Sequence, residues 1–280
     1  MLVKDLLPFG LSFLKNDINR IEDISLLTQH ICGFESYKQI IINAENKITK
    51  EQEDLFKKAL EELKQNKPVH YITKEKFFYN RKFHINEHCL IPRWDSEEMI
   101  LKSLQLVKNH FQEKEIKILD LCSGSGCLGV SLACELRNKT QKAKLTMWDI
   151  SQNAMEAAVL NAKTHNVDFE VIISNFLQHK PTTQNEKYDI ILFNPPYIKS
   201  KDIANLDEKI KNFEPTAALD GGEDGLIFYQ HINTNLHFLL NENGFLVMEY
   251  GFDQFEEIKN IFQSQCKIEP FTDLHCIVNF

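Results

Sequence analysis

The chain has 280 residues, of which 43% are hydrophobic, and its formal net charge at pH 7 is −8. This length exceeds the usual size of a single domain and supplies enough apolar area for sizeable cores, so we expect a folded protein of more than one domain. The negative charge argues against direct binding of nucleic acid, which normally requires a basic face.

The amino-terminal residues and the cysteines narrow the class of protein further. No uncharged apolar run of about 18 residues is present, and the first residues are too acidic and interrupted for a signal peptide. We therefore expect a cytoplasmic protein that does not enter membranes. The seven cysteines include no Cys-x-x-Cys pair and have no histidine cluster beside them, which argues against a disulfide framework and predicts no metal site.

Residues 1–68 predict a small helical domain. Between residues 5 and 65, apolar side chains recur at the three- and four-residue spacing of amphipathic helices, which indicates a bundle of about four short helices. Pro68 is expected to end the last of them. The aromatic-rich segment 69–92 predicts a β-hairpin linker, with strands around 77–79 and 83–85.

Residues 93–280 predict one larger α/β domain. Helical patterns alternate there with short apolar segments, as in a mostly parallel sheet that helices cover on both faces. The expected strands begin near Ile116, Leu145, Phe169, Tyr188 and Gly244, and a last strand lies within 274–280.

The first strand of this domain leads into a glycine-rich loop and then into an apolar helix start. Gly124, Gly126 and Gly129 have the G-x-G-x-x-G spacing that lets a backbone approach a nucleotide cofactor closely. Asp149 ends the next strand about 20 residues later, where a carboxylate can accept hydrogen bonds from both hydroxyls of a ribose. This arrangement suits either NAD or S-adenosylmethionine.

A second motif, Asn194-Pro195-Pro196-Tyr197, closes the apolar run 190–193. Because proline lacks an N–H, the carbonyls before and within the pair remain free to accept hydrogen bonds, and Asn194 adds a side-chain carbonyl. Two acceptors directed at one amino group would hold its nitrogen and free its lone pair, while Tyr197 covers it with a flat face. The motif favours methyl transfer to nitrogen, and S-adenosylmethionine over NAD, although a strand-ending turn has the same signature.

The polar segment 198–224 follows this motif. Such segments beside an active site usually act as lids or substrate loops. We expect Glu214 and Pro215 to brace the Asn-Pro-Pro-Tyr loop, and a helix to start near Leu226.

Together, these motifs resemble the release-factor glutamine methyltransferases of the HemK/PrmC type. The matching segments, in chain order, are 90–93, 120–126, Asp149, 194–197, 213–215 and 218–226. The resemblance covers nearly the whole chain. It implies a class I S-adenosylmethionine-dependent methyltransferase domain, Rossmann-like with an antiparallel edge, and a helical domain before it that docks the substrate.

The resemblance also implies the reaction. Members of the family transfer a methyl group from S-adenosylmethionine to the side-chain amide N5 of the glutamine in the Gly-Gly-Gln motif of class 1 peptide chain release factors. Release factors are thus the expected partners, and the protein itself is expected to be a monomer. Asn194, Pro195, Pro196 and Tyr197 would receive the glutamine as the catalytic residues, and we expect direct transfer without a covalent enzyme intermediate.

By position, the resemblance implies which residues bind the cofactor: some form the glycine loop, and others hold its ribose or lie against its adenine. The residues are Asp120, Cys122, Ser123, Gly124, Ser125, Gly126, Asp149, Asn175, Phe176 and Asn194. Two of them depart from the family pattern. Cys122 stands where glycine is usual, and Asn175 stands where an acidic residue normally receives the adenine amino group, although an amide oxygen can accept that bond.

Three other functions remain open on the sequence. Cys122 gives the glycine loop a slight resemblance to that of the related enzymes that methylate a glutamine of a large-subunit ribosomal protein. Asn-Pro-Pro-Tyr also occurs in DNA amino-methyltransferases, which act after base flipping, but this chain has no additional target-recognition domain and little basic surface. A module that binds S-adenosylmethionine without transferring its methyl group is the third, and the intact motif at 194–197 argues against it.

Overall fold

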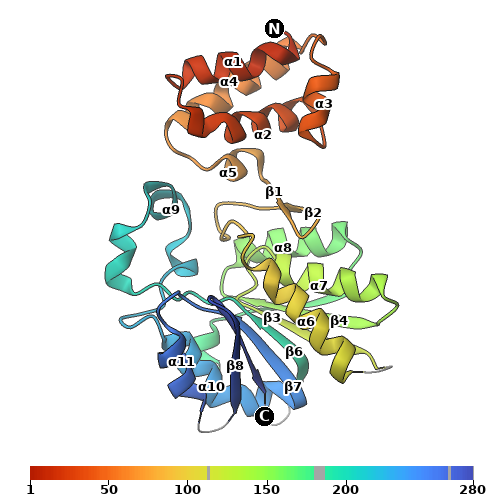
Figure 1. The fold of residues 1–280 in the computed structure, drawn as a ribbon, viewed down its shortest axis with the longest axis vertical. Helices are drawn as coiled ribbons and strands as arrows, with labels where there is room; N and C mark the ends of the chain where they lie inside the picture. Colours follow the sequence, from red (N-terminus) through yellow and green to blue (C-terminus); the bar gives the residue numbers. More distant parts are fainter. Residues whose placement is uncertain (112–113, 180–186, 264–265, 280) are drawn as a thin grey trace. The chain divides into compact units, whose positions relative to one another are not determined.

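The computed structural model describes residues 1–111, 114–179, 187–263 and 266–279 (Figure 1). The chain divides into two compact units. The helical unit comprises Met1–Glu75 together with Glu208–Phe213, and the sheet unit comprises Lys76–Asp207 together with Glu214–Phe280.

The helical unit is built from short amphipathic helices. They are α1 (Val3–Phe13), α2 (Ile21–Cys32), α3 (Tyr37–Ile42), α4 (Lys50–Lys64), α5 (Val69–Thr73) and α9 (Glu208–Phe213), with the 3-10 helix η1 (Ile18–Arg20). Helices α1, α2 and α4 direct their apolar faces inward, so that Leu6, Ile24, Leu27 and Phe56 are fully buried. The helical bundle expected over residues 5–65 is therefore confirmed.

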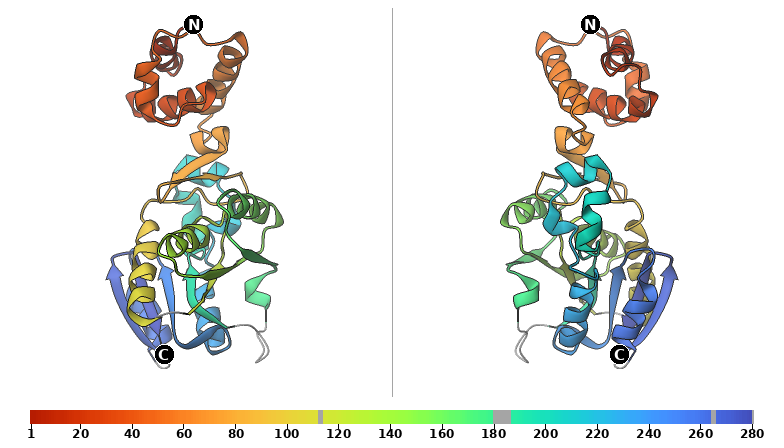
Figure 2. Two further views of the ribbon diagram at one scale, coloured as in Figure 1. Left: turned by 90° about the vertical axis from the view of Figure 1, so that its right-hand side faces the viewer. Right: turned by 90° about the vertical axis from the view of Figure 1, so that its left-hand side faces the viewer.

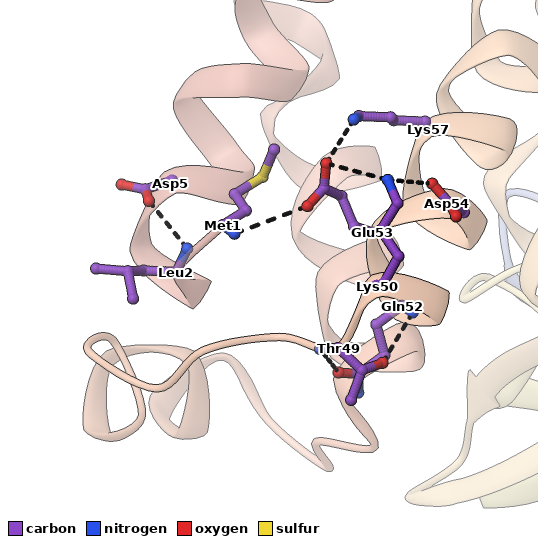
Figure 3. Close-up of polar contacts among 9 residues, drawn as sticks. All are labelled: Met1, Leu2, Asp5, Thr49, Lys50, Gln52, Glu53, Asp54 and Lys57. Atoms are coloured by element: carbon purple, nitrogen blue, oxygen red, sulfur yellow. Dashed lines mark hydrogen bonds and ion pairs between the residues drawn. The ribbon is translucent and has the colours of Figure 1, made fainter.

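A capping box fixes the start of α4 (Figure 3). Thr49 Oγ1 accepts the N–H of Gln52 at 3.1 Å, and Gln52 Oε1 accepts the N–H of Thr49 at 2.9 Å. Glu53, in the same turn, accepts from Lys57 at 2.5 Å and lies 3.7 Å from the amino group of Met1. The two capping bonds satisfy backbone donors that a helix start leaves unpaired.

The segment between the bundle and the large sheet contains a helix and a two-stranded sheet. The strands are β1 (Glu75–Phe78) and β2 (Arg81–His84), close to where the aromatic pattern predicted them. Residues 69–73, however, form α5 and not part of the hairpin. Their β-branched and aromatic composition favours a strand, but Val69 and Tyr71 are buried, so packing overrides the local preference.

The sheet unit is built on a seven-stranded sheet in the order β5-β4-β3-β6-β7-β9-β8. Its strands are β3 (Ile116–Leu121), β4 (Ala143–Asp149), β5 (Phe169–Ile173), β6 (Tyr188–Phe193), β7 (Leu240–Glu249), β8 (Lys267–Thr272) and β9 (His275–Asn279). Neighbours from β5 to β7 are parallel, whereas β9 runs antiparallel to β7 and β8. The mostly parallel sheet with an antiparallel edge is confirmed, and β8 is a strand that the sequence did not predict.

Helices cover both faces of this sheet (Figures 1 and 2). One face carries α6 (Glu97–His110), α7 (Cys127–Asn138) and α8 (Gln152–Thr164), and the other carries α10 (Ile227–Leu239) and α11 (Phe255–Phe262). Because side chains alternate along a strand, Ile190 and Leu192 enter the first core while Ile191 and Phe193 enter the second. Within the described ranges, no helix is both long and apolar enough to cross a bilayer.

The strand order reverses between β3 and β6. From β3 the chain continues outward to β4 and β5, whereas β6 is followed by β7 on its other side. At such a point the loops diverge and leave a crevice at the carboxyl ends of the strands. The glycine loop follows β3 and the Asn-Pro-Pro-Tyr motif follows β6, so the topology brings the two motifs to this crevice.

Candidate active site

A cavity of about 590 Å³ lies at the carboxyl ends of β3, β4 and β6, within the sheet unit. Many of the predicted site residues line it: Cys122, Ser123, Gly124, Ser125, Asp149, Asn175, Phe176, Asn194 and Pro196. The structure therefore brings most of the predicted cofactor residues and two residues of the Asn-Pro-Pro-Tyr motif to one cavity. Ser96 and Ser174 also line the cavity, and the sequence analysis did not name them.

Four predicted site residues do not line the cavity: Asp120, Gly126, Pro195 and Tyr197. Asp120 is buried, and its Oδ2 accepts the N–H of Gly129 at 2.9 Å. Burial raises the pKa of this carboxyl to about 7 against the opposing effect of that hydrogen bond. Tyr197, expected to cover the target with its ring, donates its hydroxyl to Glu249 Oε1 at 3.3 Å. The side chains of Asp120 and Tyr197 thus contact residues around the cavity without lining it.

The glycine loop between β3 and α7 follows a left-handed path. Cys122, Gly124 and Gly126 have φ angles of 61°, 53° and 73°. A Cβ on Gly126 would come 2.9 Å from Met147 Sδ, so glycine is required there. Cys122 adopts this conformation with a side chain, which costs about 1–2 kcal/mol. The loop brings its backbone to the cavity, as a nucleotide cofactor requires.

Asp149, at the end of β4, ties the glycine loop to the second strand. Its Oδ2 accepts the N–H of Gly124 and its Oδ1 accepts that of Ser151, both at 2.8 Å. Burial raises the pKa of this carboxyl, whereas the backbone hydrogen bonds lower it. Each oxygen keeps a further lone pair, so the side chain can still accept the two hydroxyls of a ribose.

Two serines that line the cavity have hydroxyls whose hydrogen-bonding capacity the described residues leave unused. Ser123 Oγ and Ser174 Oγ are buried, and neither has a hydrogen-bond partner in the described part of the chain. Buried polar atoms without partners are uncommon, because leaving them unpaired is unfavourable. We take them as groups that a polar ligand would complete.

Phe176 presents an aromatic surface at the same cavity. Its ring packs edge-on against Trp148, with centroids 5.5 Å apart, and against His231, at 4.7 Å. Asn175, the preceding residue, uses Oδ1 to accept the N–H of Leu177 at 3.0 Å. One lone pair of that oxygen remains, so the pair of residues suits a flat, amino-bearing base such as adenine.

Asn194, at the end of β6, is held by two residues that the sequence analysis did not identify. Its Nδ2 donates to Ser96 Oγ at 3.2 Å, and Ser96 Oγ donates to Glu249 Oε2 at 2.5 Å. The sequence does contain a signal for Glu249, because a single carboxyl within the apolar run 245–250 requires buried partners. Ser96 had none, since it lies far from both partners along the chain.

The segment that follows the Asn-Pro-Pro-Tyr motif packs closely against it. The N–H of Gly221 donates to the carbonyl of Ile198 at 2.8 Å, and a Cβ on Gly221 would come 2.8 Å from Tyr197 Cα. Of the two residues expected to brace the motif, Glu214 forms an ion pair with Arg93 at 2.5 Å and Pro215 lines the cavity. Because Arg93 lines the cavity, this pair joins the segment to the cavity wall.

The glycine cradle, the carboxylate with free lone pairs and the unpaired serine hydroxyls fit S-adenosylmethionine, and on this sheet they define a class I S-adenosylmethionine-dependent methyltransferase. Family models agree: the methyltransferase small domain matches residues 96–242, and the PrmC N-terminal domain matches residues 5–73. The chain belongs to the family of release factor glutamine methyltransferases, and it is an enzyme that takes its methyl group from S-adenosylmethionine.

Relatives of known name show this membership. The release factor glutamine methyltransferase of Mycoplasma mycoides subsp. mycoides is 36% identical over 87% of this chain and 84% of its own length. That of Clostridium acetobutylicum is 32% identical over 95% of this chain and 91% of its own. The crystal structure of the hMettl16 catalytic domain shares the fold alone, with a TM-score of 0.52 and 15% identity over 70% of this chain and 73% of that chain.

Proposed function

We propose that this enzyme methylates the side-chain amide N5 of the glutamine in the Gly-Gly-Gln motif of class 1 peptide chain release factors, by direct transfer. One observation carries the proposal: Asn194 and Pro196 line the same cavity as Asp149 and the glycine loop. The motif that we propose to bind the amide therefore shares a cavity with the groups that fit the methyl donor. The names of the relatives support release factors as the source of the amide.

For the cofactor, we propose that Asp149 accepts the ribose hydroxyls and that Asn175 and Phe176 receive the adenine. Ser123 and Ser174 would donate to polar groups of the same molecule. When bound, S-adenosylmethionine supplies an electrophilic methyl group on a sulfonium sulfur. The residues of this chain then have to orient the acceptor nitrogen and exclude water from it.

For the substrate, we propose that Asn194 Oδ1 and the carbonyl of Pro195 accept the two N–H bonds of the glutamine amide. Pro195 itself does not line the cavity, but its carbonyl is bonded to the nitrogen of Pro196, which does. An amide nitrogen is a poor nucleophile, because its lone pair is delocalised into the carbonyl group. Holding both hydrogens orients that lone pair toward the methyl group, and such positioning contributes several kcal/mol. The nitrogen releases its proton after transfer, so no strong base is required.

The test is mass spectrometry of purified proteins mixed with S-adenosylmethionine. One tube contains a class 1 release factor, a second contains the large-subunit ribosomal protein, and Asn194→Ala is the matched enzyme control. We expect one methyl group on the Gly-Gly-Gln glutamine with the wild type and none with the variant. Methylation of the ribosomal protein alone would assign the reaction to that substrate, and no methyl group on either protein would overturn the proposal.

We further propose that the helical unit docks the release factor. Its helix α3 leaves three large side chains exposed to solvent, Tyr37, Ile41 and Ile42, at 51%, 63% and 68%. Exposed apolar side chains gathered on one short helix are a feature of interaction surfaces. Docking outside the cavity would let the enzyme recognise a whole protein while the cavity receives a single side chain.

A further inference from the structure

Three polar side chains at the Asn-Pro-Pro-Tyr end of the cavity form a chain of hydrogen bonds. Glu249 ends β7, Ser96 directly precedes α6, and Asn194 follows β6. Glu249 and Ser96 are 4% and 3% exposed. The links are 2.5 Å between Glu249 Oε2 and Ser96 Oγ, and 3.2 Å between Ser96 Oγ and Asn194 Nδ2. Each residue comes from a different element, so only the folded protein assembles this chain.

The chemistry of the three groups gives the chain one direction. The hydroxyl of Ser96 has one proton, and it donates that proton to Glu249 Oε2. The hydroxyl then offers only lone pairs to Asn194, which must turn its NH2 toward Ser96. We infer that Glu249 and Ser96 are positioning residues that select the amide orientation of Asn194 in which Oδ1 is presented to the substrate NH2. This inference rests on the proposed function, in which that oxygen receives the glutamine amide.

Other groups around Glu249 contact its carboxyl and the backbone at the end of its strand. Tyr197 Oη donates to its Oε1 at 3.3 Å, and burial, with the charge of Glu249, raises the pKa of Tyr197, so the phenol keeps its proton. His275 Nε2 lies 3.4 Å from Oε2 without hydrogen-bond alignment, and its Nδ1 lies 2.7 Å from Thr272 Oγ1. The hydroxyl of Tyr229 donates to the backbone carbonyl of Glu249 at 2.8 Å, which fixes the end of β7.

The orientation of Asn194 matters because its amide group carries an acceptor on one side and donors on the other. With Oδ1 toward the substrate, it accepts an N–H of the glutamine amide. In the inverted orientation, N–H bonds would face N–H bonds and both sets of donors would lack partners. The two orientations have the same shape, so packing alone cannot choose between them, and the hydrogen-bond chain supplies the choice.

Three variants test the inference through methylation of a purified class 1 release factor at saturating S-adenosylmethionine. Ser96→Ala removes the link, so we expect kcat to fall about tenfold, the equivalent of one hydrogen bond. Glu249→Gln can donate to Ser96 and thereby turn the hydroxyl proton toward Asn194, so we expect a larger loss of about a hundredfold. Ser96→Thr keeps the hydroxyl and should retain roughly half or more of kcat.

The matched control is Ser103→Ala, which removes the same hydroxyl group from a buried serine of α6. Ser103 does not line the cavity, and its hydroxyl donates to the carbonyl of Met99 at 2.7 Å. We expect this variant to keep its kcat, and we expect the KM for S-adenosylmethionine to stay unchanged in all four variants. Equal losses in Ser96→Ala and Ser103→Ala would overturn the inference, as would wild-type kcat in Ser96→Ala.

A second readout does not depend on the identity of the substrate. The side-chain NH2 signals of Asn194 in a nitrogen-15 NMR spectrum can be assigned by their loss in Asn194→Asp. We expect slow exchange with water in the wild type and in Ser103→Ala, and fast exchange in Ser96→Ala. If the release factor stays unmethylated while the signals behave in this way, the proposed function fails and the orienting role of Ser96 stands. Unchanged signals in Ser96→Ala would overturn that role whatever the enzyme methylates.

Discussion

Two carboxyl groups near the glycine loop, those of Asp120 and Asp149, differ in what they can still bind. Asp120 is enclosed and uses one oxygen to hold the N–H of Gly129. Asp149 lines the cavity and has lone pairs to spare after holding Gly124 and Ser151. The first therefore supports the backbone of the loop, and the second is free to take part in binding.

The raised pKa of Asp120, about 7, predicts a dependence of stability on pH. Because the folded state holds this proton more tightly than the unfolded chain does, stability falls as the pH rises from about 4 to about 7 and then levels off. Asp120→Asn keeps the acceptor for Gly129 and cannot ionise. Relative to this variant, we expect the free energy of unfolding of the wild type to drop by about 2–3 kcal/mol between pH 5 and pH 8.

Urea unfolding of both proteins at the two pH values measures this difference. The control is the far-ultraviolet circular dichroism of each folded protein, which should not change with pH. Parallel pH dependence in the wild type and Asp120→Asn would show that Asp120 is ionised in the folded state across this range.

We expect substitution of Asp149 to impair cofactor binding and substitution of Asn194 to impair methyl transfer. Asp149→Ala removes acceptors for two ribose hydroxyls, so we expect affinity for S-adenosylmethionine to fall about a hundredfold, since a hydrogen bond to a charged group contributes about 1.5 kcal/mol. Asn194→Ala should bind the cofactor within about twofold of the wild type and lose transfer about a hundredfold or more. Calorimetric titration and single-turnover methylation separate the two effects, and equal losses of binding and transfer in both variants would contradict the division of roles.

At the scale of secondary-structure elements, burial decides what the sequence could predict. β3 and β6 are mostly apolar, buried segments, each followed by a loop that contains glycine or proline, so both strands were predicted correctly. β8 is an edge strand without a fully buried side chain and with Pro270 inside it, so no apolar pattern reveals it. The contact between Ser96 and Asn194 also escaped prediction, because local patterns do not report which distant side chains meet.

The ion pair between Arg93 and Glu214 predicts the behaviour of the segment that follows the Asn-Pro-Pro-Tyr motif. Arg93→Ala would leave the Glu214 carboxyl, whose side chain is 2% exposed, without its partner. We expect a loss of about 2 kcal/mol, less than for a fully buried pair because Arg93 is partly exposed. We also expect faster amide hydrogen exchange in residues 198–226, measured by mass spectrometry of peptides.

The control for this experiment is Lys259→Ala, which removes an exposed partner 3.6 Å from Glu256 on α11. Such a surface pair should change stability by no more than about 0.5 kcal/mol. Adding Glu214→Gln to Arg93→Ala should recover part of the stability, because it removes the unpaired charge. If exchange in 198–226 were the same in Arg93→Ala and Lys259→Ala, the ion pair would have no part in fastening the segment.

At the scale of the whole molecule, the proposed docking role of the helical unit predicts a difference between protein and peptide substrates. Ile41→Ser together with Ile42→Ser should lower kcat/KM for an intact release factor about tenfold, since apolar contact area is lost. A short peptide containing Gly-Gly-Gln should be methylated as before. Leu160→Ser, at a comparably exposed position of α8, is the matched control. Equal losses on peptide and protein would place the effect in the fold and not in docking.

The grouping of α9 with the helical unit has a consequence for how the protein is made. Glu208–Phe213 belong to that unit, where Lys209 Nζ lies 3.9 Å from Asp23 Oδ2, although residues 76–207 are synthesised in between. A ribosome adds about 5–20 residues each second, so the first 75 residues wait on the order of ten seconds for their last helix. The unit that begins the chain is therefore completed only after β3 to β6 have been translated, and its folding cannot finish in the order of synthesis.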